Sequence, residues 1–382
     1  MKLTEKVRLY PSKEQREIII SHMDMFLEEI NKLIVMDSKG VNIYKFTSKN
    51  IDADLPGCIR SECCKEAKKI VKKYHKDCGK ATRKHEYKVK YYQERVAEGK
   101  KTRPPKDLKL PELPELRSRC YYVTNQNYKV VDGKVFCPFR INGKTKRLEI
   151  PTKMTKRQED IIYNSKLGTM IIYILGDDIY AGIVYNKDDV KFREFGNVMG
   201  VDLGIQCPAV SYCTDGDIKF YGNGRENRYI RLHYQSLRKS MAKGGHIDAI
   251  KRLGDKERRI MKDIDHKISR EIVNRALEHD VCKIVLEDFS KMDSNVNRYN
   301  RRVNRVLHNW SFSRLSRYIE YKANMEGIAV EYVDPSDTSK ICPRCGKKND
   351  IRGRLYECEC GFRMHRDIVG AMNICRKSEP IG

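Results

Sequence analysis

The feature that most constrains this chain is a set of four cysteines near its end, at the spacing of a metal site. Cys342 and Cys345 form a Cys-x2-Cys pair followed by glycine, and Cys358 and Cys360 form a Cys-x-Cys pair that glycine also follows. Four thiolates at about 2.3 Å from one ion make a closed, tetrahedral, structural zinc site. The alternatives are unrelated thiols, two disulfides or a redox pair. We therefore expect residues 338–363 to form a small subdomain held by Zn2+.

The strongly basic composition points to a polyanionic partner. The chain has 382 residues and a formal net charge of +25. A positive excess of this size is costly through self-repulsion and is typical of proteins that bind nucleic acid. A basic protein without such a partner is the alternative. The length predicts about two or three domains with ample core.

Cysteine usage and hydropathy indicate a reducing compartment. The chain has fourteen cysteines, but its first residues lack the apolar segment of a secretion signal, so free or metal-bound thiols are expected. No window approaches the length of about 18 apolar residues that a membrane span requires. We expect a cytoplasmic protein with no membrane partner. The cysteines at residues 58–78 do not match a zinc knuckle and are expected to lie on helix faces.

The first third of the chain is predicted to be mainly helical. A strand at residues 6–10 precedes a helix that starts at Lys13, where Ser12 and Gln15 match a capping box. From residue 55 to 97 the pattern is helical and basic, with tyrosines among the lysines. This pattern suits a solvated helix face, or a surface that neutralises a nucleic-acid backbone and stacks on its bases. The Gly- and Pro-containing residues that follow predict a linker.

Residues 120–187 change to the period of two that is typical of β-strands. Asp132-Gly133 and Asn142-Gly143 are hairpin turn signals between short alternating segments. We expect a small β-barrel that the strand at residues 6–10 completes. The basic helical segment is then an insertion in this barrel.

The remaining sequence predicts an α/β domain with an acid in its first strand. Residues 198–205 read as an apolar strand with Asp202 buried in its middle. A charged carboxylate there is costly unless it is paired or binds a metal. The elements expected after it are strands at 209–213 and 218–221, two charged helices within 225–278, a strand at 281–288, a helix from Trp310 to Gly327, a strand at 328–333 and a final helix that begins near Asp367.

This order of elements is that of a ribonuclease H-like fold, in which the first strand, the fourth strand and the last helix bring acids to one sheet edge. Asp202, Glu287 and Asp367 occupy these places. Three converging carboxylates repel one another unless cations bind, and their hard oxygens select Mg2+ or Mn2+. Two such ions can activate water and stabilise the leaving oxygen of a phosphodiester. Asp288 competes with Glu287, but neighbours on a strand face opposite sides. Without this topology, each acid would be a capping or salt-bridge residue.

Several short motifs carry a resemblance that covers nearly the whole chain. They are Arg8-Leu-Tyr-Pro11, Thr124-Asn-Gln-Asn127, Gly200-Val-Asp-Leu-Gly204, Leu286-Glu-Asp-Phe289, Thr338 to Gly346 with its cysteines, and Arg366-Asp367 leading to Ala371-x-Asn373-Ile374. Together they resemble TnpB-type RNA-guided endonucleases of bacterial insertion sequences, which are related to compact type V CRISPR effectors. The chain departs from the frequent family pattern with His365 and with Gly370, but it retains the acid, Asp367.

The resemblance implies a multidomain α+β protein that contains a ribonuclease H-like, or RuvC, nuclease domain with an inserted zinc ribbon. A small wedge β-barrel and an inserted helical recognition lobe precede it. The implied boundaries are 1–11 for the first strand of the wedge barrel, 12–118 for the recognition lobe, 119–195 for the rest of the barrel, 196–337 for the first part of the nuclease, 338–363 for the zinc ribbon and 364–382 for the final helix and tail.

The implied function is RNA-guided cleavage of double-stranded DNA beside a short motif that the protein reads. Base pairing with a guide RNA encoded near the gene supplies specificity, and one protein is expected per RNA. The implied cofactors are the guide RNA, structural Zn2+ and catalytic Mg2+ or Mn2+, and association with the bacterial nucleoid is implied when the protein is bound to DNA. The sequence leaves open whether the protein serves transposon maintenance or another task. By analogy, Asn125, Arg60 and Tyr74 are expected to contact nucleic acid. On the charged helices, the expected contacts are Arg238, Arg258 and Arg259.

Three other classes of protein remain open. A nuclease-inactive, RNA-guided DNA-binding repressor on the same scaffold would be expected to lose one of the three acids, and all three are present. A ribonuclease H-like transposase shares the core, but a zinc ribbon just before the last acid argues against it. A zinc-ribbon RNA-binding protein without catalysis would leave the cost of a buried Asp202 unexplained.

Overall fold

The computed structural model describes residues 1–188, 190–289, 312–350 and 353–378. It divides the chain into two compact units, Met1–Asp188 and Asp189–Gly382. Each unit has its own sheet and its own hydrophobic core. Trp310, which we expected at the start of a helix, lies outside the described residues.

The first unit is built on a seven-stranded antiparallel sheet with the strand order β2-β6-β7-β1-β5-β4-β3. Its strands are β1 (Lys2–Leu9), β2 (Cys120–Val123), β3 (Lys129–Val131), β4 (Lys134–Ile141), β5 (Lys144–Lys153), β6 (Lys166–Leu175) and β7 (Asp178–Asn186). Strand β1 pairs with both β5 and β7, so it joins the later strands as predicted. In the described part of the unit β2 and β3 end the order, so the sheet is open rather than the closed barrel we expected. Strand β7 was not predicted.

The two hairpin signals in this sheet are confirmed. Asp132 and Gly133 have φ values of 47° and 67°, and Asn142 and Gly143 have values of 52° and 73°. A two-residue loop with positive φ at both positions matches the right-handed twist of the strands that it joins. These turns therefore set the register of β3 with β4 and of β4 with β5.

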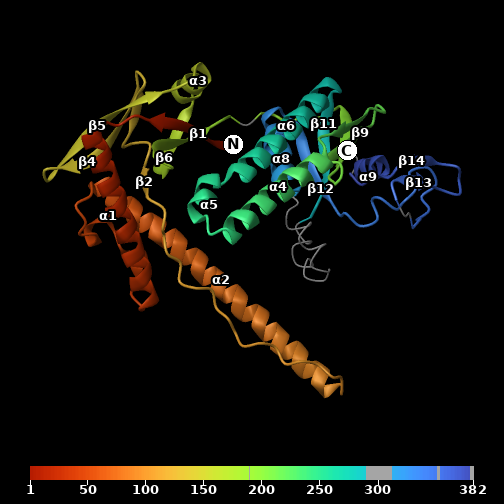
Figure 1. Cartoon of the computed structure of the whole chain (residues 1–382), viewed down its shortest axis with the longest axis horizontal. Helices are drawn as coiled ribbons and strands as arrows, with labels where there is room; N and C mark the ends of the chain where they lie inside the picture. Colours follow the sequence, from red (N-terminus) through yellow and green to blue (C-terminus); the bar gives the residue numbers. More distant parts are fainter. Residues whose placement is uncertain (189, 290–311, 351–352, 379–382) are drawn as a thin grey trace. The chain divides into compact units, whose positions relative to one another are not determined.

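The helices of the first unit are α1 (Lys13–Ser38), α2 (Gly57–Ala97) and α3 (Lys156–Asn164), with short 3-10 turns at Ile43–Lys45 and Ser48–Asn50. The capping box of α1 is confirmed, since the Gln15 N–H donates to Ser12 Oγ and the Ser12 N–H donates to Gln15 Oε1. In α2 the last buried residue is Val71. Figure 1 shows the remainder of α2 as a long rod. Helix α3 was not predicted.

The second unit is built on a five-stranded sheet with the order β10-β9-β8-β11-β12. Its strands are β8 (Asn197–Asp202), β9 (Ala209–Cys213), β10 (Ile218–Tyr221), β11 (Val281–Glu287) and β12 (Ala329–Val333). Strands β8, β11 and β12 run parallel to one another, whereas β9 and β10 form an antiparallel edge. The strand predictions for this unit are confirmed.

Helices α6 (Lys256–Glu278) and α8 (Phe312–Met325) cover one face of this sheet, and α9 (Arg366–Arg376) covers the other. The unit also contains α4 (Gly224–Lys243), α5 (Ile247–Leu253) and a small hairpin of β13 (Leu355–Glu357) and β14 (Arg363–His365), which precedes α9. Met199 and Val201 pack with α6 and α8, while Val198 and Val285 pack with α9. The prediction of two charged helices was wrong, because the chain breaks at Gly254, where φ is positive, as well as at Gly244-Gly245.

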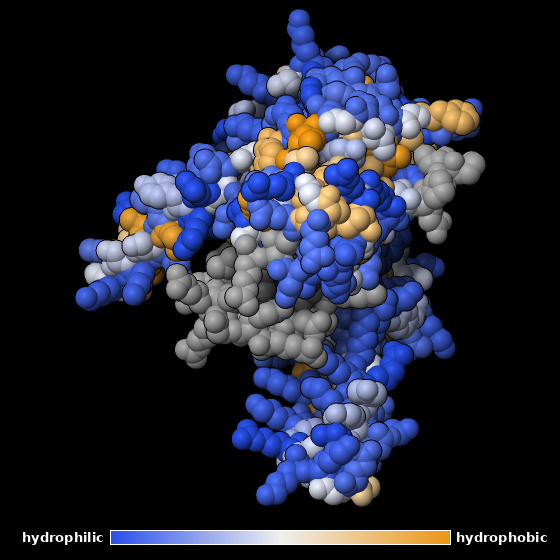
Figure 2. All heavy atoms as spheres, turned by 90° about the vertical axis from the view of Figure 1, so that its right-hand side faces the viewer, coloured by the Kyte–Doolittle hydropathy of each residue, from blue (hydrophilic) through white to orange (hydrophobic). Residues whose placement is uncertain are grey.

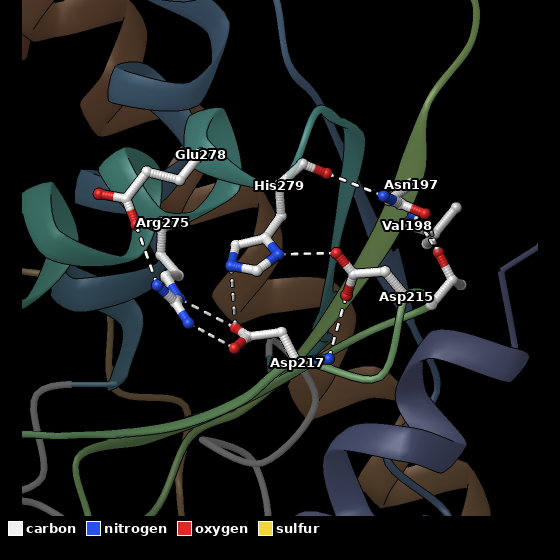
Figure 3. A network of polar contacts seen from close by, with 8 residues as sticks. Asn197, Val198, Asp215, Asp217, Arg275, Glu278 and His279 are labelled. Atoms are coloured by element: carbon white, nitrogen blue, oxygen red, sulfur yellow. Dashed lines mark hydrogen bonds and ion pairs between the residues drawn. The ribbon is translucent and has the colours of Figure 1, made fainter.

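A network of acidic and basic side chains lies at the edge of this sheet where strands β8 and β11 begin (Figure 3). Asp215 and Asp217 come from the turn between β9 and β10, and Arg275 and His279 come from the end of α6. Arg275 Nε lies 2.9 Å from Asp217 Oδ2, and His279 Nδ1 lies 2.6 Å from Asp215 Oδ2. Asn197 at the start of β8 donates to the carbonyl of His279 at 2.9 Å. Each charge in this network has a partner of opposite sign.

The surface is predominantly polar. The face drawn in Figure 2 is dominated by hydrophilic side chains, with apolar ones gathered in smaller patches. Across the described residues, every helix is too short or too polar to span a membrane.

Candidate active site and metal centre

The first two predicted acids end neighbouring parallel strands. In the register of β8 and β11, Val201 lies opposite Leu286, so Asp202 and Glu287 follow at the same level. Asp202 is the last residue of its strand, which corrects the prediction that it lies in the middle. Carboxyl ends of parallel strands meet at one edge of a sheet, which places both acids at the edge opposite the charge network of Figure 3.

Helix α9 brings the third acid, Asp367, to the same face of the sheet. A Cβ at Gly370 would lie 2.7 Å from Asp202 Oδ2, and a Cβ at Gly200 would lie 2.2 Å from the carbonyl oxygen of Ala371. Neither glycine can be replaced by a larger residue without a shift of the helix or the strand. Glycine at position 370, which departs from the frequent family pattern, therefore has a steric reason, because it leaves room for the Asp202 carboxylate.

Burial and like charge raise the pKa values at this edge. Burial, followed by the charges of Glu287 and Asp367, raises the pKa of Asp202 to about 8. Burial also raises the pKa of Glu287, whose side chain is 6% exposed. Carboxyls that are destabilised in this way gain most from a bound cation, so the arrangement is suited to hard metal ions.

Two polar side chains that the motif search did not assign hold this edge together. Thr338 Oγ1 donates to Glu287 Oε1 at 2.6 Å. Asn373 Nδ2 donates to the carbonyls of Thr338 and Ile341, both at 2.7 Å. All of these contacts are buried or nearly so, and they fix the orientation of the Glu287 carboxylate. Thr338 and Asn373 were quoted in the motifs, but their spacing gave no indication of these bonds.

Arg354 is a further site residue that the sequence reasoning missed. Its Nη1 lies 2.7 Å from both carboxylate oxygens of Asp367. Its carbonyl accepts a hydrogen bond from the N–H of Arg366 at 2.7 Å, which ties the two segments together. The charge of Arg366 opposes, but does not overcome, the rise in the pKa of Asp202 that burial and the neighbouring acids cause. No motif marks Arg354, because only the fold of β13 and β14 brings it to α9.

The four predicted cysteines form one cluster. Their sulfurs all lie within 4.8 Å of one another, with Cys342 and Cys360 at 3.7 Å and Cys345 and Cys358 at 3.5 Å. Sulfurs at about 2.3 Å from a tetrahedral zinc ion would be about 3.8 Å apart, whereas a disulfide requires about 2.05 Å. The cluster therefore fits zinc and does not fit two disulfides.

Within the part of the chain that the structure describes, this cysteine cluster is the one group of three or more His, Cys, Asp or Glu side chains whose ligand atoms converge as a metal ion requires. The cysteines at residues 58–78 lie on α2, as expected.

The nucleic-acid residues predicted in the first unit have different environments. Asn125 is exposed in the turn between β2 and β3. Tyr74 is half-buried on α2, with its ring centroid 5.7 Å from that of His75. Arg60 Nη1 donates to the carbonyl of Ile51 at 3.1 Å, so part of this guanidinium has a structural role.

The three arginines predicted in the second unit lie on the charged helices. Arg238 Nη1 lies 2.6 Å from Glu257 Oε2, so it joins α4 to α6. Arg258 and Arg259 are exposed on α6, and Arg258 lies 3.9 Å from Asp255. The structure therefore leaves Arg258 and Arg259 accessible, while Arg238 has a partner within the protein.

Known proteins resemble this chain in sequence. Residues 312–374 match the model of the Cas12f1-like TNB domain. A TnpB-like protein of Methanocaldococcus jannaschii is 41% identical over 230 residues, which cover 57% of this chain and 81% of that protein. The CRISPR-associated endodeoxyribonuclease Cas12f1 of Sulfoacidibacillus thermotolerans is 29% identical over 214 residues, covering 51% of this chain and 49% of that protein.

A second TnpB-like protein and a solved structure match nearly the whole chain. The TnpB-like protein of Acanthamoeba polyphaga mimivirus is 24% identical over 402 residues, which cover 98% of this chain and 72% of that protein. The Cas12f1 chain in a cryo-EM structure of a Cas12f1-sgRNA-target DNA complex has a TM-score of 0.56 at 13% identity and covers 98% of both chains. This likeness establishes the multidomain α+β fold.

Proposed function

The chain belongs to the TnpB-like family, and from this premise we propose that it is an RNA-guided DNA endonuclease whose nuclease site is the acidic edge of the five-stranded sheet. The observation that carries the proposal is the meeting of Asp202, Glu287 and Asp367 from β8, β11 and α9, with the pKa of Asp202 raised to about 8. A related solved structure contains a guide RNA and target DNA.

The three acids would hold two divalent ions, Mg2+ or Mn2+. Bound there, the ions would supply activation of a water molecule and stabilisation of the leaving oxygen of a phosphodiester. Asp202 and Glu287 project from neighbouring strand ends, and Asp367 comes from the helix above them. In the proposed site, carboxylate oxygens from the sheet and from the helix would reach one phosphate through these ions.

Other residues of the chain orient these acids. Thr338 holds one oxygen of Glu287, which leaves the other oxygen available for a cation. Arg354 contacts Asp367 with one guanidinium nitrogen, so it is placed to neutralise the charge of a phosphate that approaches this acid. The zinc cluster supports both residues, since it folds the segment that carries them.

We assign the domains on the same basis. The assignment is 1–11 and 119–195 for the wedge, 12–118 for the recognition lobe, 196–337 and 364–382 for a RuvC-like nuclease, and 338–363 for a zinc ribbon.

Four exposed or half-buried side chains are proposed to contact nucleic acid: Asn125, Tyr74, Arg258 and Arg259. Arg60 and Arg238 would do so only if they exchanged their present contacts within the protein for contacts with nucleic acid. The protein would act in the cytoplasm on chromosomal or transposon DNA, with one chain per guide RNA.

The proposal is tested by purifying the protein from its native locus and sequencing the RNA that co-purifies. The complex is then added to a plasmid library that carries a target complementary to the RNA, flanked by randomised sequence. We expect cleavage that requires Mg2+, the RNA and one class of flank. The control is the Asp202→Ala complex, which should bind the same RNA without cutting.

Other outcomes separate the alternatives. Bound RNA with target binding but no cleavage by the wild-type protein would favour a repressor. Absence of RNA with metal-dependent DNA breakage would favour a transposase. Absence of both RNA binding and cleavage would contradict the proposal outright.

A further inference from the structure

An aromatic side chain lies in line with the acids on the same face of the sheet. In the register of β9 and β10, Phe220 lies opposite Val210, and in that of β8 and β9, Val210 lies opposite Asp202. Side chains of directly opposed residues point to the same face. Phe220, Val210 and Asp202 therefore form one row across three strands, with Phe220 about 10 Å, or two strand spacings, from the acid.

Phe220 is exposed, although its neighbour in this row is buried. It is 45% exposed, whereas Val210 beside it is 1% exposed. Strand β10 is the outermost strand of the sheet, so no further strand lies beside the ring on that side. On its other side, the ring makes an edge contact with His365, with centroids 5.2 Å apart and planes at 82°.

His365 connects this aromatic ring to the acid on α9. It is the N-cap of the helix, and its Nδ1 accepts a hydrogen bond from the N–H of Asp367 at 3.3 Å. The contact with His365 limits the motion of the Phe220 ring and leaves the ring partly uncovered. A fixed and exposed ring beside a cleavage site is suited to hold a planar partner.

We propose that Phe220, supported by His365, is a stacking platform for an unpaired nucleobase of the DNA strand whose phosphate lies at the three acids. The inference rests on the proposed nuclease function and adds a positioning residue to it. The distance of the ring from Asp202 is comparable to the reach from a phosphate to a base of the adjoining nucleotide. Because every base has a π-face, such a platform would hold any of the four bases and would not select a sequence.

The base is favoured over an apolar protein partner by the position of the ring. The exposed face is continuous with an edge that selects cations and, through them, phosphates. A nucleotide can satisfy both parts of this surface at once, with its phosphate at the acids and its base on the ring. A protein segment would have to bring an apolar side chain next to buried carboxyls.

The test uses the complex with its co-purified RNA and a matching duplex, under single-turnover conditions with Mg2+. Wild type is compared with Phe220→Ala, with Phe220→Trp and with Ile218→Ala, which truncates a half-buried residue on the same strand and face but farther from the acids. Each protein is also tested on substrates with single abasic sites placed around the cut. Zinc content and circular dichroism verify that the variants fold.

We expect Phe220→Ala to slow cleavage by about 5- to 100-fold and to spread the cut positions, because loss of one base stack has an effect of this order. Phe220→Trp and Ile218→Ala should cleave close to the wild-type rate. One abasic position should slow the wild type by a similar factor and have no further effect on Phe220→Ala. This coupling identifies a base contact, because a merely structural defect would add to the effect of the abasic site.

Equal cleavage by Phe220→Ala and wild type, or additive effects of the variant and the abasic sites, would overturn the platform while leaving the nuclease assignment intact. A change in self-association without a change in cleavage would assign the ring to a protein contact instead. Absence of cleavage by the wild type would contradict the proposed function itself, which separates the two failures.

Discussion

The acidic side chains at the two edges of the five-stranded sheet have opposite electrostatic environments. At the edge where the strands start, Asp215 and Asp217 face His279 and Arg275, and the pKa values of both acids are lowered, chiefly by an N–H bond to Asp215 and by the Arg275 bond to Asp217. At the edge where β8 and β11 end, Asp202 lies near two further carboxyls and its pKa is raised to about 8.

The difference shows which edge stabilises the fold and which one is available for chemistry. Paired charges lower the free energy of the folded state and leave little affinity for an added ion. Grouped like charges raise the free energy of the folded state, and a divalent cation relieves that cost. The sheet therefore concentrates its electrostatic strain at the edge that we assign to catalysis.

The largest expected effect follows from removing an acid at the strained edge. Asp202→Asn or Glu287→Gln should reduce cleavage of a guide-matched plasmid by about a thousandfold or more, because each carboxylate would hold a metal ion. Stability should stay the same or rise, since a repulsive charge is lost. The matched control is Asp288→Asn, next to Glu287 on the chain, and the measurement is the single-turnover rate. Full cleavage by Asp202→Asn would refute the site.

The next largest effect is expected from a change in the cysteine cluster, and it measures how far the acidic edge depends on residues 338–363. Cys345→Ser should release zinc and lower cleavage by at least about tenfold, because a structural zinc site contributes folding free energy to its segment. That segment carries Thr338 and Arg354, which contact two of the acids. Elemental analysis and cleavage rates provide the measurement, with Cys78→Ser as control. Zinc content equal to that of the wild type would contradict the metal assignment.

The pH dependence of stability should have opposite signs at the two edges. The pKa of Asp202 is raised from 3.8 in the folded protein. Its contribution to stability is therefore full below about pH 3.8 and is lost as pH rises toward 8, by up to about 1.4 kcal/mol per pH unit.

Urea unfolding between pH 5 and 8, without added Mg2+ and without chelators, measures this dependence. The decrease in the free energy of unfolding with rising pH should be smaller in Asp202→Asn than in the wild type. Added Mg2+ should also reduce this decrease, because it stabilises the charged carboxylate. An identical slope in the variant would show that Asp202 does not titrate in this range.

The smallest effect is expected at the compensated edge. Asp217→Asn should lower the free energy of unfolding at pH 7 by about 1 kcal/mol, because it removes a charge-assisted hydrogen bond to Arg275 at a partly buried site. The pKa of Asp217 is lowered, so this contribution is present above pH 3.8 and is lost as pH falls through the lowered value. Cleavage should not change. The control is Asp248→Asn, whose exposed pair with Lys251 should contribute nothing measurable.

Much of the architecture could be predicted from sequence because short-range rules specify it. The capping box at Ser12 and Gln15, the turns at Asp132-Gly133 and Asn142-Gly143, and the order of strands in the second unit depend on residues close in the chain. Strand β7, helix α3 and the division of the charged segment into three helices were missed. Their signals are weaker, and packing against the rest of the fold decides them.

For the site, the sequence by itself determined which groups can do chemistry, through the spacing of the cysteines and the positions of the three acids in the order of elements. Only the tertiary structure decided what surrounds them. Arg354 reaches Asp367 through the hairpin of β13 and β14, Thr338 reaches Glu287 across 51 positions of the chain, and Phe220 aligns with Asp202 through a third strand. Ligand spacing is a local property of the backbone, whereas the partners of a buried charge depend on which distant segments pack together.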